Sequence, residues 1–247
     1  MEAIEAEPDA PVEATPAPLD VITLIAGPRS GTGHLLSLLS SVEGVAVRGD
    51  LLRDATGDLA ASVDAAMDGA RADGKALLVL RATSALPRED VERYLLDRPG
   101  MRGLFVVRRQ VDAYVSLAKA RALNAWEGTD LTNVKVKLDA EHFAAWLEEE
   151  EAWYTHWKAW LERRAFPTPV LRYETNIVDQ PGETVLRRFA SAASQVGITV
   201  RPPAAVTTGL VKQDKQRTVA FKVKNWPDFS RGLGERGIEK RAFGYPI

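Results

Sequence analysis

Short apolar runs alternate with longer amphipathic segments along most of the chain, and this alternation limits the possible folds more than any other feature. The apolar runs are rich in Val, Leu and Ile, and runs of this kind are typical of strands that are buried on both faces. We predict strands at 21–26, 45–47, 76–80, 103–107 and 170–173. The segments between them predict helices at 32–40, 59–72, 88–96, 111–123, 138–163 and 183–196. Alternating strands and helices form a parallel sheet, and right-handed crossovers then give a three-layer α/β/α domain.

The first nineteen residues differ from the rest of the chain. They carry five acidic residues, four prolines and no basic residue, whereas the whole chain of 247 residues is 45% hydrophobic. A segment of that composition cannot bury enough apolar surface to offset its chain entropy. We therefore expect a disordered acidic tail over 1–19 and one domain over 20–247, although this length also allows two small domains.

Composition excludes several classes of function. The net charge of −2 argues against a nucleic-acid-binding protein, because such domains usually carry a large basic excess. The absence of cysteine excludes disulfides, thiolate metal sites and a cysteine nucleophile, and three histidines are too few to predict a multi-histidine metal centre. We find no apolar run of eighteen residues and no signal-peptide pattern, so we expect a cytoplasmic enzyme without an integral membrane segment.

A glycine-rich turn follows the first predicted strand directly. Residues 27–35 read Gly-Pro-Arg-Ser-Gly-Thr-Gly-His-Leu and lead into a predicted helix. Glycines let the backbone approach a ligand, and the first turn of a helix presents unpaired N–H groups. Arg29, Ser30 and Thr32 add a cation and two hydroxyls. The segment predicts an oxyanion site; the alternative is a glycine-rich turn with no ligand.

The same turn departs from the nucleotide P-loop pattern G-x-x-x-x-G-K-[ST]. Gly27 and Gly33 are one residue too far apart, and His34 stands where that pattern has its lysine. An ordinary kinase or NTPase is therefore disfavoured. A degenerate P-loop nucleotide kinase or NTPase stays open as an alternative, and magnesium-dependent ATP turnover would identify it.

A second set of polar residues follows the fourth predicted strand. Arg108 ends that strand, and Ser116 falls eight residues later, two turns into the next helix, so both side chains can face one ligand. The carboxyl ends of parallel strands share one edge of a sheet, which places this pair at the same edge as the glycine-rich turn. Each residue taken alone has an alternative interpretation: Arg108 could be a surface arginine, and Ser116 could be a serine that faces solvent.

Both motifs resemble those of the sulfotransferases that use 3′-phosphoadenosine 5′-phosphosulfate (PAPS). Pro28-Arg29-Ser30-Gly31-Thr32 resembles the family's 5′-phosphosulfate motif, and Arg108 with Ser116 resembles its 3′-phosphate motif. Asp112 lies between these two residues, as an aspartate often does in the family, whereas Arg109-Gln110 replaces the usual Asn-Pro. The resemblance implies a P-loop-NTPase-like sulfotransferase fold, with PAPS as donor and 3′-phosphoadenosine 5′-phosphate (PAP) as product.

Further segments resemble the bacterial carbohydrate sulfotransferases of the trehalose and nodulation-factor type. They are residues 120–126, the tryptophan-rich helix and residues 170–174. The resemblance implies that 170–174 closes a central strand and that Tyr173 lies near the adenine; a core tyrosine is the alternative. In related enzymes a basic loop such as 212–226 closes over the 3′-phosphate, which points to Arg217 first and Lys215 second. A solvated charged loop is the alternative here.

The resemblance also assigns chemical roles. Sulfuryl transfer from PAPS to a hydroxyl or amine of a carbohydrate or small molecule would need no metal, with Arg29 at the leaving-group oxygen. The remaining donors would be Ser30, Gly31, Thr32 and Gly33. Asp50 is the first candidate for the general base, and His34 competes with it; an N-cap role is the alternative for Asp50. A catalytically silent nucleotide-binding module stays open, as do the acceptor and the oligomeric state.

Aromatic residues recur along the helix predicted at 138–163. Phe143, Trp146, Trp153, Trp157 and Trp160 follow one another at helical spacing. Regular spacing of this kind predicts core packing rather than a sugar-stacking platform. The better candidate for lining an acceptor pocket is the tryptophan at position 126, which lies outside this stripe.

Overall fold

The structure is a computed structural model, and it describes residues 18–49, 59–126, 128–206 and 212–247. Two of the sequence-based predictions lie outside these ranges. They are Asp50, the first candidate for the general base, and all but the last two residues of the predicted acidic tail.

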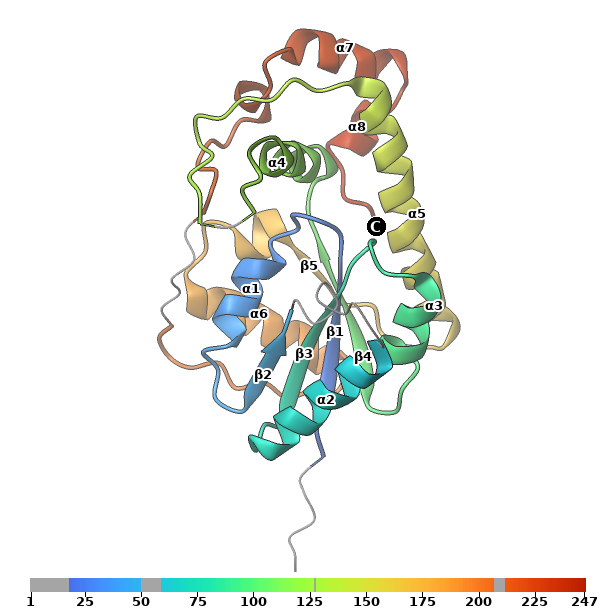
Figure 1. The fold of residues 1–247 in the computed structure, drawn as a ribbon, viewed down its shortest axis with the longest axis vertical. Coiled ribbons are helices and arrows are strands. Elements are labelled where there is room, and N and C mark those ends of the chain that lie inside the picture. The colour runs from blue at the N-terminus through green and yellow to red at the C-terminus, as the bar shows by residue number, and fades with distance from the viewer. Residues whose placement is uncertain (1–17, 50–58, 127, 207–211) are drawn as a thin grey trace, which may run out of the picture.

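A five-stranded parallel sheet forms the centre of the fold (Figure 1). Its strands are β1 (Asp20–Ala26), β2 (Val45–Arg48), β3 (Leu77–Ala82), β4 (Met101–Val107) and β5 (Val170–Arg172). They lie in the order β2-β3-β1-β4-β5, and every neighbouring pair is parallel. The five predicted strands and their parallel arrangement are therefore confirmed.

Helices cover both faces of this sheet, as predicted for a three-layer domain (Figure 1). On one face α1 (Thr32–Leu39) and α6 (Gly182–Gln195) pack on the strands through leucines, valines and Phe189. The other face is covered by α2 (Leu59–Ala72), α5 (Ala140–Arg163) and a π-helical turn over Val91–Leu96. Two apolar cores thus hold the sheet between two helical layers.

A third cluster lies beyond the sheet. There α4 (Gln110–Leu123) and α5 meet two short helices near the end of the chain, α7 (Trp226–Glu235) and α8 (Glu239–Ala242). The sequence did not predict α7, because its two glycines and proline lower helix propensity. Burial of Phe229 against Phe143, with ring centroids 5.6 Å apart, stabilises it instead. No helix among the described residues is both long and apolar enough to cross a membrane.

Three further details differ from the prediction. The helix predicted at 88–96 is a single turn, α3 (Arg88–Asp90), that continues into the π-helical turn. The strand β5 lies at an edge of the sheet, so its expected central position was wrong. Tyr173 does not finish that strand but starts a π-helical turn over Tyr173–Ile177, and its partly buried side chain packs against the core on the α1 and α6 face of the sheet.

The tryptophan stripe of α5 is core, as its spacing predicted. Trp153, Trp157 and Trp160 are buried against the sheet face, and Phe143 is buried in the third cluster. Trp146 is the exception, since it is half-buried and borders a narrow gap beside the glycine-rich turn. The helix is capped by Asp139, whose carboxylate accepts hydrogen bonds from the first backbone N–H groups of the helix.

Candidate functional site

The two sequence motifs meet at the carboxyl edge of the sheet. Strands β1 and β4 are neighbours with Ala26 opposite Val106, so the segments that follow them leave the sheet side by side. Arg108 Nη1 donates a hydrogen bond to the carbonyl oxygen of Arg29 at 2.9 Å. The turn after β1 and the arginine after β4 are therefore in direct contact, in the region where parallel sheets bind their ligands.

Two residues of the turn adopt positive φ angles, Arg29 with φ 61° and Gly31 with φ 90°. An arginine in this conformation is strained, and such strain is typical of functional sites. At Gly31 an added Cβ would lie 2.3 Å from a ring carbon of Tyr173. The Tyr173 ring also lies under the guanidinium of Arg108, 4.3 Å from ring centroid to Cζ. Tyr173 thus packs between the turn and Arg108.

The side chain of Arg29 joins three separate segments. Its Nε donates to Ser116 Oγ at 3.0 Å, its Nη1 to the carbonyl oxygen of Trp126 at 2.8 Å, and its Nη2 to Gln213 Oε1 at 2.5 Å. The first motif and Ser116 of the second are therefore hydrogen-bonded to each other. Trp126, predicted as a candidate for lining an acceptor pocket, contributes its backbone carbonyl here, and its side chain is exposed.

Several buried donors of this region lack a hydrogen-bond partner among the described residues. They include Ser30 Oγ, Arg108 Nε and Gln213 Nε2, and Ser30 is only 2% exposed. A buried polar group without a partner is costly, and native structures usually pair such groups with protein, water or ligand. A ligand rich in acceptor oxygens, such as a phosphate or sulfate ester, complements this set of donors.

The other predicted residues of the turn occupy mixed positions. Pro28 borders the narrow gap, and the hydroxyl of Thr32 accepts a 3.4 Å hydrogen bond from Arg81. Gly33 and His34 belong to the first turn of α1. His34 is half-buried, and burial lowers the pKa of its imidazole from 6.5, which favours the neutral form.

In the basic segment near the end of the chain, Lys215 and Arg217 lie at the surface. Lys215 pairs with Asp130 at 3.6 Å and Arg217 with Asp179 at 3.3 Å, and both basic side chains are more than half exposed. The structure does not bring either residue to Arg108 or Ser116. Gln213 reaches the turn instead, through its hydrogen bond from Arg29.

A buried ion network anchors this segment to α4. Lys119, which is fully buried, contacts Asp214 at 2.7 Å. Lys222 is also buried and lies 3.6 Å from Asp214 and 3.7 Å from Asp112. Burial lowers the pKa of Lys222, the two aspartates oppose this change, and the positive charge of Arg108 adds to it. Lys222 is therefore a buried basic residue close to Arg108.

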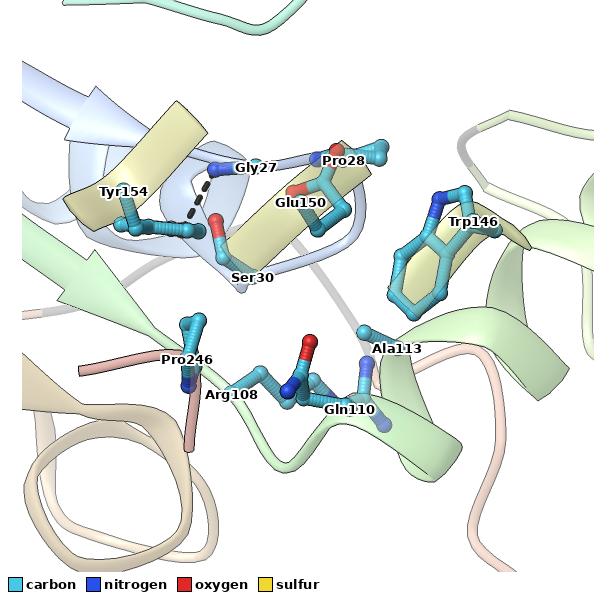
Figure 2. A pocket seen from close by; sticks show the side chains of 10 residues that line it. All are labelled: Gly27, Pro28, Ser30, Arg108, Gln110, Ala113, Trp146, Glu150, Tyr154 and Pro246. Atoms are coloured by element: carbon cyan, nitrogen blue, oxygen red, sulfur yellow. Dashed lines mark hydrogen bonds between the residues drawn. The ribbon is translucent and has the colours of Figure 1, made fainter. Parts of the chain in front are cut away.

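Sequence reasoning missed one carboxylate, Glu150 of α5. It is only 6% exposed, and its Oε1 accepts a 2.8 Å hydrogen bond from the hydroxyl of Ser84. The pKa of Glu150 is raised from 4.5 to about 7, mainly by burial; the hydrogen bond from Ser84 opposes this rise, and the charge of Glu149 contributes to it. Figure 2 shows Glu150 beside Gly27 on one side of the narrow gap, with Arg108 on the other.

The sequence does hold a signal for Glu150. It lies within a run of four glutamates, 148–151, and such runs are typical of a solvated helix face. However, it follows Leu147 by three residues and precedes Trp153 by three, so it occupies a position of the buried stripe. A charged residue at a core position of a helix is the pattern that would have identified it.

Comparisons with known proteins find similarity at the level of structure and not of sequence families. No family model matches the chain, and no curated protein matches it. Among solved structures, the mouse sulfotransferase SULT7A1 complexed with PAP is similar over 91% of this chain and 83% of that chain, with 17% sequence identity and a TM-score of 0.46. The function proposed for this chain therefore rests on the residues of its site.

Proposed function

We propose that this chain is a sulfotransferase that moves a sulfuryl group from PAPS to a hydroxyl, or less favourably an amine, of a carbohydrate or small molecule. One observation carries the proposal: Arg29 contacts both residues of the second motif, receiving a hydrogen bond from Arg108 at 2.9 Å and donating one to Ser116 at 3.0 Å. A nucleotide with phosphate groups on both sides of its ribose needs two adjacent anion sites. The contacts of Arg29 are the reason to assign both sites to one nucleotide.

In this proposal the turn over residues 28–33 binds the 5′-phosphosulfate. Ser30, Gly31, Thr32 and Gly33 donate hydrogen bonds from hydroxyls and backbone amides, and the strongly positive φ of Gly31 shapes the turn. Arg29 neutralises the charge that develops on the leaving-group oxygen. Its guanidinium would exchange some of its present protein partners for that oxygen.

The opposite side of the site binds the 3′-phosphate. Arg108 and Ser116 supply a cation and a hydroxyl, and Arg108 Nε is a buried donor with no partner among the described residues. Tyr173, which packs under Arg108, would lie beside the adenine. Lys215 and Arg217 could add to the 3′-phosphate site only after they leave their surface partners, whereas Gln213 Nε2 is already buried without a described partner.

Sulfuryl transfer to an acceptor is an in-line displacement at sulfur. The sulfuryl group carries less negative charge than a phosphoryl group, so arginine and N–H donors can stabilise the transition state without a metal ion. The product is PAP. The acceptor hydroxyl must lose its proton during transfer, which requires a base.

Calorimetric titration with PAP and with ATP, each with and without Mg²⁺, tests the proposal. A charged contact to the 3′-phosphate is worth about 2 kcal/mol or more, so we expect PAP to bind at least about 30-fold more tightly than ATP, independently of Mg²⁺. Tighter binding of ATP that depends on Mg²⁺ would favour a degenerate nucleotide kinase. PAP binding without sulfuryl transfer from PAPS to any acceptor in a broad screen of hydroxyl compounds would identify a catalytically silent nucleotide-binding module.

A further inference from the structure

The helix α5 is held against the glycine-rich turn by a tyrosine one turn after Glu150. Tyr154 Oη accepts a hydrogen bond from the Gly27 N–H at 2.6 Å and donates one to the carbonyl oxygen of Val106 at 2.8 Å. Both bonds are buried, so the tyrosine joins the helix to the ends of β1 and β4 together. The position of Glu150 relative to the turn is therefore fixed by buried contacts.

The carboxylate of Glu150 lies directly against the start of this turn. An added Cβ at Gly27 would lie 2.2 Å from Glu150 Oε2, closer than any real side chain allows. Gly27 is thus the residue that gives the carboxylate room. The other oxygen, Oε1, accepts a hydrogen bond from Ser84 in the segment after β3. The carboxylate is therefore held between the segments that follow β1 and β3.

Glu150 also borders two spaces of different size. The gap between the turn and Arg108 has a volume of only about 10 Å³, room for about one water molecule. The hollow that contains Ser84, Arg88, Trp153 and Glu150 in its wall measures about 310 Å³, which is the lower end of the range for small-molecule sites. A molecule in that hollow would therefore contact the same carboxylate that borders the turn.

We infer that Glu150 is the general base that takes the proton from the acceptor hydroxyl, and that the acceptor occupies the hollow with this hydroxyl beside the carboxylate and directed toward the turn. This inference rests on the proposed sulfuryl transfer. The acceptor O–H bond breaks and its proton goes to the Glu150 carboxylate, while the oxygen's electron pair forms the new O–S bond. The S–O bond to the 5′-phosphate breaks, its electron pair stays on PAP, and Glu150 later passes the proton to water.

The surroundings of Glu150 fit a base that works near neutral pH. Burial raises its pKa to about 7, so a large share of the carboxylate is ionised at neutral pH and is more basic than an ordinary glutamate. The groups that face it are Glu149 on its own helix, the Ser84 hydroxyl, Arg108 across the gap and Arg88 in the wall of the hollow. Because the ionised form is the base, we expect the transfer rate to rise with pH through about 7.

Single-turnover transfer of the labelled sulfuryl group from PAPS tests this role, measured as free sulfate with water as the acceptor and as a sulfate ester with trehalose as a probe hydroxyl compound. Glu150→Gln keeps the shape of the side chain and an oxygen for Ser84 but cannot take a proton. We expect a rate at least about 100-fold lower, loss of the rise near pH 7 and unchanged PAP affinity. Glu148→Gln, at an exposed position of the same helix, is the matched control and should leave the rate unchanged.

A second variant tests the base without touching it. Glu149→Gln removes the neighbouring negative charge that raises the pKa of Glu150, so the rise in rate should move to lower pH. A Glu150→Gln protein that binds PAP and releases sulfate at the wild-type rate would overturn the inference and leave the proposed function intact. An unmoved pH profile in Glu149→Gln would also overturn it. Wild-type protein that fails to bind PAP, or that transfers the sulfuryl group of PAPS to no acceptor in a broad screen of hydroxyl compounds, refutes the proposed function itself.

Discussion

Replacement of Glu150 by glutamine should change how the stability of the protein depends on pH. The carboxyl group has an ordinary pKa of 4.5, which burial raises to about 7 in the folded chain. Between these values the folded state holds more protons than the unfolded state, so stability falls as pH rises. Above about pH 7 the full cost is present, and a shift from 4.5 to about 7 corresponds to about 3 kcal/mol.

Glutamine has no charge to bury, so Glu150→Gln should be free of this cost. Urea unfolding followed by fluorescence of the six tryptophans measures the free energy of unfolding of both proteins between pH 5 and pH 8. We expect the variant to gain about 2.5 kcal/mol relative to wild type over this interval, since part of the cost is already present at pH 5. Glu148→Gln, at an exposed position, should show no such trend.

A constant difference between Glu150→Gln and wild type across this range would refute the reasoning. It would mean that the carboxyl group titrates near its ordinary pKa in the folded chain. A difference that grows toward acidic pH would refute it as well, because the sign would then be that of a carboxylate stabilised by its surroundings.

Two further substitutions test the packing around the site. Asp214→Ala leaves two buried lysines without their shared carboxylate and should lower the free energy of unfolding by about 3 kcal/mol. The control Asp228→Ala, at an exposed position, should lower it by less than about 1 kcal/mol. Equal losses of the two variants in urea unfolding would contradict the buried ion network. Gly31→Ala and Gly44→Ala both place alanine at positive φ, but only Gly31 faces Tyr173, so its variant should lose more stability and also PAP affinity. Matching losses at the two glycines would show that the approach of Tyr173 is unimportant.

Much of the fold follows from local patterns in the sequence. The strands were predictable because runs such as 103–107 are continuously apolar, and the turn at 27–31 was predictable because glycines follow such a run. Parallel pairing then brings the residues after β1 and β4 to one edge, which is why Arg29 and Arg108 could be expected to lie close together.

The remaining features depend on tertiary contacts that no local pattern encodes. The helix α7 forms because Phe229 is buried against α5, and the edge position of β5 depends on pairing alone. In the basic segment, Lys222 is buried and Arg217 is exposed although both belong to one charged stretch. Glu150 is different, because its spacing from Leu147 and Trp153 is a local signal for burial, which the run of four glutamates hides.

The most direct test of the central claim, that two motifs bind opposite phosphates of one nucleotide, compares PAP with adenosine 5′-monophosphate (AMP), which lacks the 3′-phosphate. Calorimetry should show that wild type prefers PAP by at least about 30-fold, and that Arg108→Ala loses most of this preference while it still binds AMP. Arg102→Ala, near the opposite end of β4, should keep the preference. An Arg108→Ala protein that discriminates PAP from AMP as well as wild type does would contradict the account.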